Sequence, residues 1–387
     1  MTGTVGSMST TTENSADQAL LKTPFNAFHV EHGAKMVPYA GWSMPIHYGS
    51  IIDEHNQVRS SGGFFDVSHM GRLRITGRHA RKFLDTVCTR QVLGMQKGQC
   101  RYSLICNEQG GCLDDVLVYC FDDDDFMVVC NGANRAKIVA HFEASRGDLV
   151  FKFKDVTEST AMCAIQGPRV MDVIGGLSRE IPTLKKYRFT EKNLIITKLL
   201  VSRTGYTGED GVEVIIDAKM ASMAMKMLLK EGTEATELIK PAGLGARDSL
   251  RLEAGMPLYG HELTEQIDPL SAGLNFAVKL DKGQDDERTG SFIGQAALQQ
   301  IAENGPPRRL VGLSCDGRRS PRQDMKVLDG QDEIGFVTSG CLSPTLGHPI
   351  AMAYVLPDRA EPGTTLVVDA GRDTIEATVT KLPFLSR

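Results

Sequence analysis

The chain has 387 residues, enough for two or three domains with full cores. It carries 43 Lys and Arg against 48 Asp and Glu, a net charge of -5, so it has no overall basic footprint for nucleic acid or for an anionic membrane. No run approaches the roughly 18 apolar residues of a membrane span, and mean hydropathy is -0.17.

The first 22 residues and the cysteines indicate the compartment. Residues 1–22 are rich in Thr and Ser, contain Glu13 and Asp17, and lack both Arg and an apolar segment. This composition predicts a disordered leader and favours a bacterial-type cytoplasmic location over the mitochondrial matrix. The nine cysteines form no C-x-x-C pair, which predicts reduced, mostly buried thiols with neither disulfide nor metal.

The ordered part is expected to open with two helices. Gly, Pro and capping residues predict helices over 24–33 and 50–59, separated by a Gly- and Pro-rich segment over 39–45. An apolar stretch that contains His69 and Met70 follows. His69 is interpreted as a structural histidine, whereas Met70 is a candidate for the lining of a flat ligand pocket.

A helix over 80–88 leads into a predicted hairpin. Residues 101–106 and 116–121 are rich in β-branched and apolar residues, and Glu108-Gln109-Gly110-Gly111 between them supplies the glycines of a tight turn. We therefore expect the two runs to pair as antiparallel strands.

Two adjacent carboxylates, Asp114 and Asp115, lie where this turn becomes strand. Side chains alternate along a strand, so Asp115 shares a face with Leu117 and Tyr119, and Asp114 points the other way with Val116 and Val118. One of the two must face an apolar side, where it needs a hydrogen-bonding or cationic partner. Two solvated turn carboxylates are the alternative.

Further elements follow the hairpin. The acidic run 122–125 predicts a solvated turn to a strand over 126–130. Asn131-Gly132-Ala133-Asn134 then begins a helix that reaches about residue 145, with Asn134 available as its cap. Residues 161–168 are expected to form a buried strand that ends in a turn, and a helix begins at Arg169.

Residues 202–213 read S-R-T-G-Y-T-G-E-D-G-V-E, a loop whose glycines allow close approach to a ligand. The loop has no Lys after its glycines and has several carboxylates, so a ligand with hydrogen-bond donors is favoured over a phosphate. Glu213 can accept two parallel hydrogen bonds from an amino-pyrimidinone edge, the group that a pterin presents.

The glycine-rich stretch 241–261 predicts a helix. Arg247, Leu250, Arg251 and Ala254 share one face of it. Its two cations either neutralise acids of the fold such as Asp248 and Glu253, or Arg247 reaches a ligand. From residue 292 the composition shifts towards short β-like runs, which predict a closed or sandwiched β domain. Gly305-Pro306-Pro307 marks the expected linker.

Taken in order, these stretches resemble the aminomethyltransferase (T protein) family of the glycine cleavage system, from about residue 23 to 384. The resemblance is carried by G-A-K-M-V-P-Y-A-G-W at 33–42, F-D-V-S-H-M-G at 65–71, N-E-Q-G-G-C-L-D-D at 107–115, I-Q-G-P at 165–168, R-T-G-Y-T-G-E-D-G-V-E at 203–213, G-L-G-A-R-D-S-L-R-L-E-A-G at 243–255, L-Y-G-H-E at 258–262 and V-T-S-G-C-L-S-P-T-L-G at 337–347.

The resemblance implies an α+β fold: a cloverleaf of two intertwined α/β lobes (residues 23–290) around a central folate cavity, with a C-terminal β-barrel (291–387). It implies tetrahydrofolate as co-substrate, with no metal or flavin, and a lipoylated H protein as partner. Asp115 matches the catalytic aspartate of the family. The positions that match ligand-binding or pocket residues are Glu213, Arg247, Tyr206, Tyr102, Asn131 and Tyr259.

Two other functions share the pattern. Folate-dependent demethylases of methylated amines are usually attached to a flavin domain, and no G-x-G-x-x-G region is present here. A non-enzymatic folate-binding protein of iron–sulfur assembly or RNA modification is expected to read K-G-C-Y-T-G-Q-E where this chain reads R-T-G-Y-T-G-E-D. The intact Asp114-Asp115 pair favours the enzyme.

Overall fold

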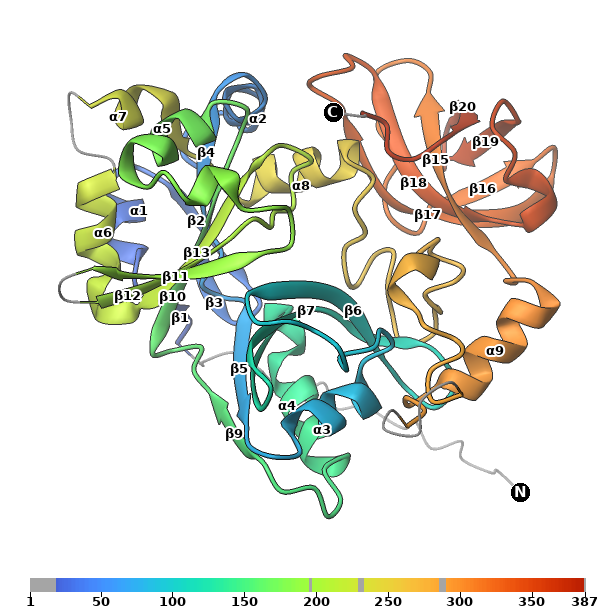
Figure 1. Cartoon of the computed structure of the whole chain (residues 1–387). Helices are drawn as coiled ribbons and strands as arrows, with labels where there is room; N and C mark the ends of the chain where they lie inside the picture. The colour runs from blue at the N-terminus through green and yellow to red at the C-terminus, as the bar shows by residue number, and fades with distance from the viewer. Residues whose placement is uncertain (1–18, 195–196, 229–232, 285–289, 386–387) are drawn as a thin grey trace, which may run out of the picture.

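The computed structural model describes residues 19–194, 197–228, 233–284 and 290–385. Two α/β units and a β-barrel are arranged around the middle of the molecule (Figure 1). The expected α+β class with a C-terminal barrel is confirmed. None of the helices in the described part is long and apolar enough to cross a membrane.

The first unit is built on a six-stranded sheet. Its strands, in sheet order, are β11 (Phe189–Leu194), β12 (Thr197–Ser202), β13 (Gly211–Asp217), β10 (Thr160–Gln166), β4 (Gly62–Asp66) and β14 (Ile239–Pro241). Its outer helices are α1 (Asn26–Glu31), α5 (Val170–Leu177), α6 (Ala221–Leu228) and α7 (Glu234–Leu238). The helices expected over 24–33 and from Arg169, and the strand expected over 161–168, are present.

The second unit is built on a five-stranded sheet. Its strands, in sheet order, are β6 (Gln99–Cys106), β7 (Cys112–Asp122), β8 (Asp125–Cys130), β5 (Gly71–Thr76) and β9 (Lys152–Asp155). Two helices, α3 (Ala80–Val87) and α4 (Arg135–Ala144), accompany it. The β6–β7 pairing confirms the expected hairpin, and the turn between β7 and β8 lies in the acidic run.

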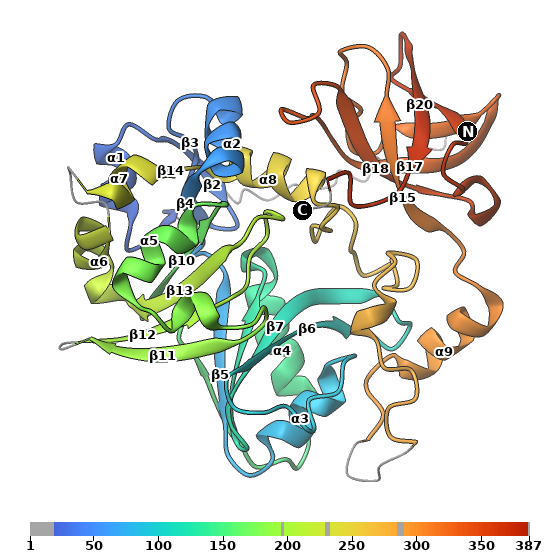
Figure 2. The same cartoon turned by 45° about the horizontal axis from the view of Figure 1, so that its top comes forward.

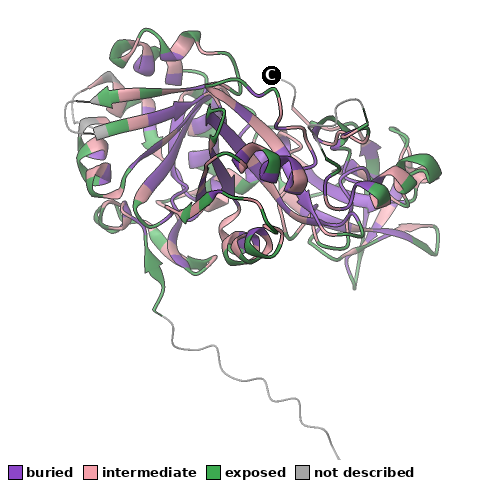
Figure 3. Cartoon of the chain, turned by 60° about the horizontal axis from the view of Figure 1, so that its bottom comes forward, coloured by how far each residue is buried: buried purple, intermediate pink, exposed green. Residues whose placement is uncertain are grey.

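The two units are interwoven because the chain crosses between them twice. It forms β4 in the first unit, then β5 to β9 in the second, and returns to the first for β10 to β14. The sheets share a buried cluster in which Tyr119 and Phe121 of β7 lie with Met162, Ile215 and Leu250. Apolar side chains occupy both faces of these central strands, which Figure 3 shows as mostly buried.

The segment expected to be irregular over 39–45 is instead part of a hairpin. β2 (Lys35–Tyr39) pairs with β3 (Trp42–His47) across Ala40 and Gly41, whose φ values of 50° and 80° suit a two-residue turn. Residues 1–18 of the expected leader lie outside the described residues. Its end is not disordered, because β1 (Leu21–Lys22) pairs in parallel with β3.

Two helices connect the first unit to the barrel. α2 (Ile51–Ser60), expected over 50–59, begins at Ser50, whose hydroxyl accepts a hydrogen bond from the Asp53 N–H at 3.2 Å. α8 (Leu244–Glu253) packs against α2 and β3 on one side and against the barrel on the other (Figure 2).

The C-terminal strands close into a barrel. They are, in order around it, β15 (Arg309–Cys315), β18 (Pro349–Val355), β17 (Asp332–Leu342), β16 (Lys326–Asp329), β19 (Thr365–Asp369) and β20 (Thr374–Thr380). A helix that was not expected, α9 (Gln295–Asn304), precedes it. The helix formers Gln-Ala-Ala-Leu-Gln-Gln explain its formation, and its Leu298 packs beside the β6–β7 hairpin.

Candidate active site

β7 places its two carboxylates on opposite faces of the second sheet, as the alternation predicted. The Asp114 side chain is fully buried on the face of Val116 and Val118, whereas Asp115 is half-buried on the face of Leu117. The alternative of two solvated turn carboxylates is wrong. The chain therefore keeps a fully buried acid next to a partly accessible one.

Two asparagines from the start of α4 hold the pair. The Asn131 side-chain amide donates to Asp114 Oδ1 at 2.8 Å and to Asp115 Oδ1 at 2.7 Å, and its backbone N–H donates to Asp114 Oδ2 at 2.9 Å. The Asn134 amide donates to Asp114 Oδ1 at 2.7 Å. Asn134 makes no side-chain cap, contrary to expectation, because its backbone is already in the helical region (φ -99°, ψ -4°) and not in the extended conformation typical of a capping residue.

Burial raises the pKa of both carboxyl groups. For Asp114 the neighbouring charge of Asp115 adds to the effect of burial, and the bonds from Asn134 and Asn131 oppose it. For Asp115 the bonds from Asn131 and Tyr102 oppose the effect of burial. The asparagines thus favour the ionised forms, and the pair can hold a carboxylate in an apolar setting.

Tyr102, on the neighbouring strand β6, completes the surroundings of Asp115. Its hydroxyl donates to Asp115 Oδ2 at 3.2 Å, and burial raises the pKa of this phenol. Its ring stacks on Phe276 with 6.0 Å between the ring centroids. Asp115 is therefore oriented by one partner on each carboxylate oxygen.

Glu213 lies on β13, next to Ser202 of β12 in the sheet. It is only 5% exposed, and among the described residues one side-chain donor is recorded for it, the Thr204 hydroxyl on Oε2. Burial raises the pKa of Glu213, while the nearby Arg247 cation and the Thr204 bond oppose this rise. Its other carboxylate oxygen remains available to a ligand with hydrogen-bond donors.

Arg247 lies beside Tyr206. Its guanidinium carbon is 4.9 Å from the centroid of the Tyr206 ring, and the Tyr206 hydroxyl donates to the Pro257 carbonyl at 2.5 Å. Arg247 Nη1 is buried and has no hydrogen-bond partner among the described residues. A buried, unpaired donor indicates a place where a ligand acceptor belongs.

The sequence left two alternatives for the arginines of α8, pairing with acids of the fold or contact with a ligand, and the two residues differ in this respect. Arg251 is committed to the fold: its guanidinium donates to Asp248 Oδ1 at 2.8 Å and to Glu262 Oε2 at 2.9 Å. Glu253 pairs instead with Arg59, at 2.8 Å. Arg247 is thus the cation of this helix that can reach a ligand.

His69 was interpreted as structural, but its environment indicates a second open position. It is 5% exposed, and its Nδ1 is buried without a partner among the described residues. Burial lowers its pKa to about 4, and Arg247 also acts to lower it, so the imidazole is neutral near pH 7. The feature that identifies His69 as a candidate site residue is its unpartnered nitrogen, which the sequence cannot show.

Met70 and Tyr259 were also predicted to belong to the site, and the structure places them in two different environments. Met70 is half-buried against the cluster shared by the two sheets. The Tyr259 hydroxyl accepts a bond from Lys137 Nζ at 2.6 Å, and this ammonium also pairs with Glu265 at 3.0 Å. No hydrogen bond recorded among the described residues joins Tyr259 to Asp115, and its role in the site stays a prediction.

The fold and the buried acid pair place the protein in a class whose members have an N-terminal domain and a C-terminal barrel. Two family models describe these two parts. The model of the GCVT N-terminal domain matches residues 25–282, and the model of the Glycine cleavage T-protein C-terminal barrel domain matches residues 308–385. The chain belongs to the glycine cleavage T-protein family, the aminomethyltransferases, and is an enzyme of that class.

Individual relatives agree. An Aminomethyltransferase of Saccharopolyspora erythraea is 43% identical over 375 residues, covering 95% of this chain and 98% of the relative. One of Moorella thermoacetica is 42% identical, with the same coverage. The crystal structure of glycine cleavage system aminomethyltransferase T from Bartonella henselae superposes with a TM-score of 0.87 at 30% identity, covering 95% of this chain and 99% of that one.

Proposed function

We propose that the protein transfers the methylene carbon of an aminomethyl group from the dihydrolipoyl arm of a lipoylated H protein to tetrahydrofolate. The products are methylenetetrahydrofolate, ammonia and the dihydrolipoyl H protein. The observation that carries this proposal is Asp115, a partly accessible carboxylate held by Asn131 and Tyr102 in a chain of the aminomethyltransferase family.

The residues present suit a folate. Glu213 offers a buried carboxylate to the paired donors of an amino-pyrimidinone ring, while Arg247 Nη1 and His69 Nδ1 are buried atoms without partners among the described residues. Glu213 and His69 each lie close enough to Arg247 for its charge to lower their pKa values. When bound, tetrahydrofolate supplies the amine nitrogens that accept the carbon.

Asp115 serves as the negative charge of the reaction. Positive charge develops on the C–N unit as the S–C bond of the aminomethyl group breaks, and a fixed carboxylate beside it lowers the barrier. Asn131 and Tyr102 keep that carboxylate oriented, and positioning of the reacting groups supplies much of the remaining acceleration. Asp114 is the buried neighbour through which the same asparagine is held in place.

One assay tests the proposal. The protein is mixed with aminomethyl-loaded H protein, and ammonia is measured with and without tetrahydrofolate. We expect ammonia release that requires tetrahydrofolate. Folate binding without ammonia release would identify a binding protein, and methylated amines accepted in place of the loaded carrier would identify a demethylase.

Glu213→Ala is expected to weaken tetrahydrofolate binding by about 1.5–3 kcal/mol, the scale of a hydrogen bond to a charged group. The cause is loss of the acceptor for the donors of the pterin ring. Calorimetric titration measures the change, with Glu191→Ala on the exposed edge of the same sheet as control. Unchanged affinity in a folded Glu213 variant would remove this residue from the binding site.

Asn131→Ala is expected to shift the acidic limb of the pH–turnover profile to higher pH. The bonds from Asn131 oppose the raised pKa values of Asp114 and Asp115, so their removal raises these values further and the Asp115 carboxylate is protonated at a higher pH. Turnover between pH 5 and 9 measures the shift. Asn193→Ala on an exposed strand is the control, and an unshifted limb in a folded Asn131 variant would contradict the assignment.

A further inference from the structure

His69 is a buried histidine to which the proposed chemistry assigns no step. Its side chain is 5% exposed, and its Nδ1 is buried without a hydrogen-bond partner among the described residues. The ring meets that of Tyr39 edge to face, with 5.3 Å between the ring centroids. Buried polar atoms are normally hydrogen-bonded, so this nitrogen indicates a group that acts on something outside the chain.

The turn that carries His69 is held rigidly by charged side chains. The Asp66 carboxylate accepts a hydrogen bond from the Ser68 N–H at 2.8 Å. Arg72 is fully buried and donates to the carbonyls of Ser68 at 3.0 Å and of Met70 at 2.6 Å. A charge is costly to bury, and here it fixes the two carbonyls on either side of His69. Such support is typical of a side chain that must be placed accurately.

The imidazole lies against the segment that orients the catalytic acid. A Cβ built on Gly132 would lie 2.6 Å from the His69 carbonyl oxygen and 3.0 Å from Cδ2 of its ring, closer than a side chain tolerates. Glycine at this position therefore admits His69. The preceding residue, Asn131, donates to Asp115 Oδ1 at 2.7 Å. His69 and Asp115 are thus both neighbours of the 131–132 segment.

The proposed reaction requires protons to move between nitrogen atoms. Two N–H groups of tetrahydrofolate each lose a hydrogen, while the released ammonia and the lipoyl thiol each gain one, so the reaction needs no oxidant or reductant. A group is needed that takes a proton as the new C–N bond forms and returns it as the old C–N bond breaks. An imidazole with its hydrogen on Nε2 has a lone pair on Nδ1 for this purpose.

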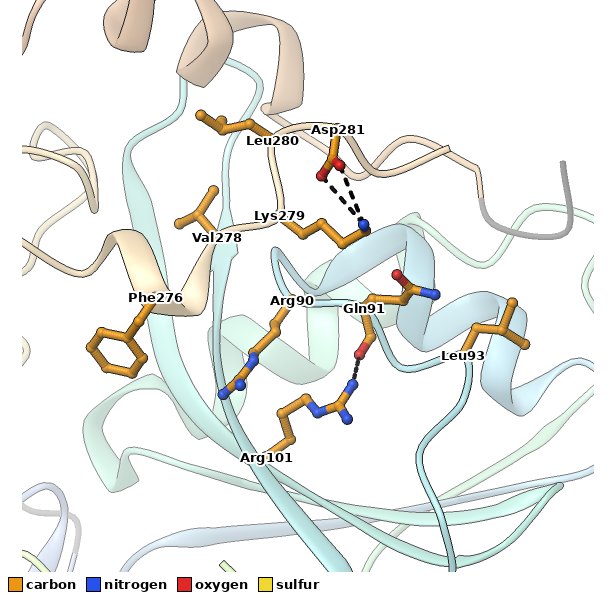
Figure 4. Close-up of a pocket in the computed structure, with 9 residues that line it drawn as sticks. All are labelled: Arg90, Gln91, Leu93, Arg101, Phe276, Val278, Lys279, Leu280 and Asp281. Carbon is orange, nitrogen blue, oxygen red and sulfur yellow. Dashed lines mark hydrogen bonds and ion pairs between the residues drawn. The ribbon is translucent and has the colours of Figure 1, made fainter. Parts of the chain in front are cut away.

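The pocket that Phe276 lines supplies no such group. It has a volume of about 520 Å³ and lies between the second sheet and the segment before α9 (Figure 4). Its ionisable lining residues are Arg90, Arg101, Lys279 and Asp281, and this aspartate is paired with Lys279 at 3.3 Å. Cations do not accept protons at neutral pH, and a carboxylate paired with one is a poor base.

The surroundings of His69 keep it able to accept a proton. Burial lowers its pKa to about 4, the charges of Arg247 and Arg72 act in the same direction, and that of Asp66 opposes them. The imidazole is therefore neutral near pH 7. Its protonated form is a strong acid for an imidazolium, which favours prompt transfer of the proton to a departing amine.

We propose that His69 is a catalytic residue that carries a proton from the attacking nitrogen of the co-substrate to the departing amine. This inference rests on the proposed function. The lone pair of the attacking nitrogen forms the new C–N bond, and Nδ1 takes the proton that this nitrogen releases. The proton then passes to the amine, whose bond to carbon breaks with the electron pair leaving on ammonia. The second hydrogen of the co-substrate neutralises the lipoyl thiolate, so atoms and charge balance.

Chemical rescue tests the proposal. His69→Ala and His69→Gln are expected to lower turnover at saturating substrates by about 10²-fold or more, the scale of general acid–base catalysis. Tetrahydrofolate affinity is expected to stay within about tenfold, the scale of one hydrogen bond. Added imidazole is expected to restore turnover to His69→Ala, which leaves a space for it, and to leave His32→Ala, an exposed control with full activity, unchanged.

A second measurement does not depend on turnover. The ¹⁵N signals of the His69 ring, identified by their loss in His69→Gln, are expected to shift when tetrahydrofolate is added without H protein. The proposal is overturned by turnover of His69→Gln within about threefold of the wild type, by a folded His69→Ala that imidazole does not rescue, or by ¹⁵N signals that tetrahydrofolate leaves unchanged. A wild type that binds tetrahydrofolate but releases no ammonia would instead contradict the proposed function.

Discussion

Asp115→Asn is expected to lower turnover by about 10²–10³-fold while leaving tetrahydrofolate affinity nearly unchanged, because an amide keeps the shape of the side chain but removes the charge that stabilises the transition state. Glu213 and Arg247, the groups proposed to face the ligand, belong to other elements, β13 and α8, so binding is not expected to depend on this carboxylate. The effect therefore falls on kcat rather than on KM for the folate.

Ammonia release under saturating substrates measures this loss, and calorimetry measures folate affinity on the same preparation. Asp122→Asn is the matched control, because Asp122 is an exposed carboxylate at the far end of the same strand. We expect the control to keep full activity. Turnover of Asp115→Asn within a factor of about three of the wild type would exclude the proposed role of the charge.

Glu253→Gln is expected to destabilise the protein by about 3–5 kcal/mol, since it removes one member of a buried charge cluster. Glu253 has no side-chain exposure and accepts bonds from Arg59 Nε at 3.0 Å, from Thr345 Oγ1 at 2.8 Å and from the Ser343 hydroxyl, with His55 Nε2 at 3.1 Å. A Gln side chain would present a donor to groups that are themselves donors. The cluster joins α8 to α2 and to the loop after β17, so its loss also loosens the barrel.

The same cluster sets a pH dependence. Burial alone would raise the pKa of Glu253, but the bonds from His55 and Ser343, with Arg59, hold it at about 2. A folded pKa below the unfolded value of about 4.3 contributes stability that is complete above that pH and is lost as pH falls towards the folded value. The difference in the free energy of unfolding between wild type and Glu253→Gln is therefore expected to shrink as pH falls from about 4.5 to about 2.

Denaturant unfolding at several pH values measures this difference. Glu361→Gln, an exposed change of the same kind on the barrel, is the control and is expected to alter stability by less than about 0.5 kcal/mol. A Glu253 variant as stable as the control at pH 7 would show that the cluster contributes little to holding the barrel.

The hairpin that carries Asp114 and Asp115 could be predicted because its signals are local. Two apolar runs, a Gly-Gly turn and a period of two determine which carboxylate faces which side, and β6 and β7 pair accordingly. The Ala40-Gly41 hairpin carried an equally local turn signal, but the Pro residues of both its strands obscured it. Helix α9 was missed because its formers were grouped with the β-like runs that follow.

The partners of the site residues could not be predicted in this way, because they come from distant parts of the chain. Asn134 follows helix-start logic as a cap, yet its amide is drawn to Asp114, twenty residues earlier. Which arginine of α8 stays open is decided by Glu262, a buried carboxylate that pairs with Arg251 at 2.9 Å. The Nδ1 atom of His69 is unpartnered because none of the described residues places a hydrogen-bonding group beside it.

The sequence by itself determined the strands and helices around the acid pair, the faces of Asp114 and Asp115, and, through its ordered motifs, the family, since each of these follows from neighbours within a few positions or from the residues themselves. Tertiary structure alone decided that Tyr102 and Asn131 orient Asp115, that Arg247 stays unpaired on one side, and that Arg90 and Arg101 share a pocket with Phe276. The physical reason is that hydrogen bonds and uncompensated charge depend on the atoms around each group in space, which pairing between distant strands and helices brings together.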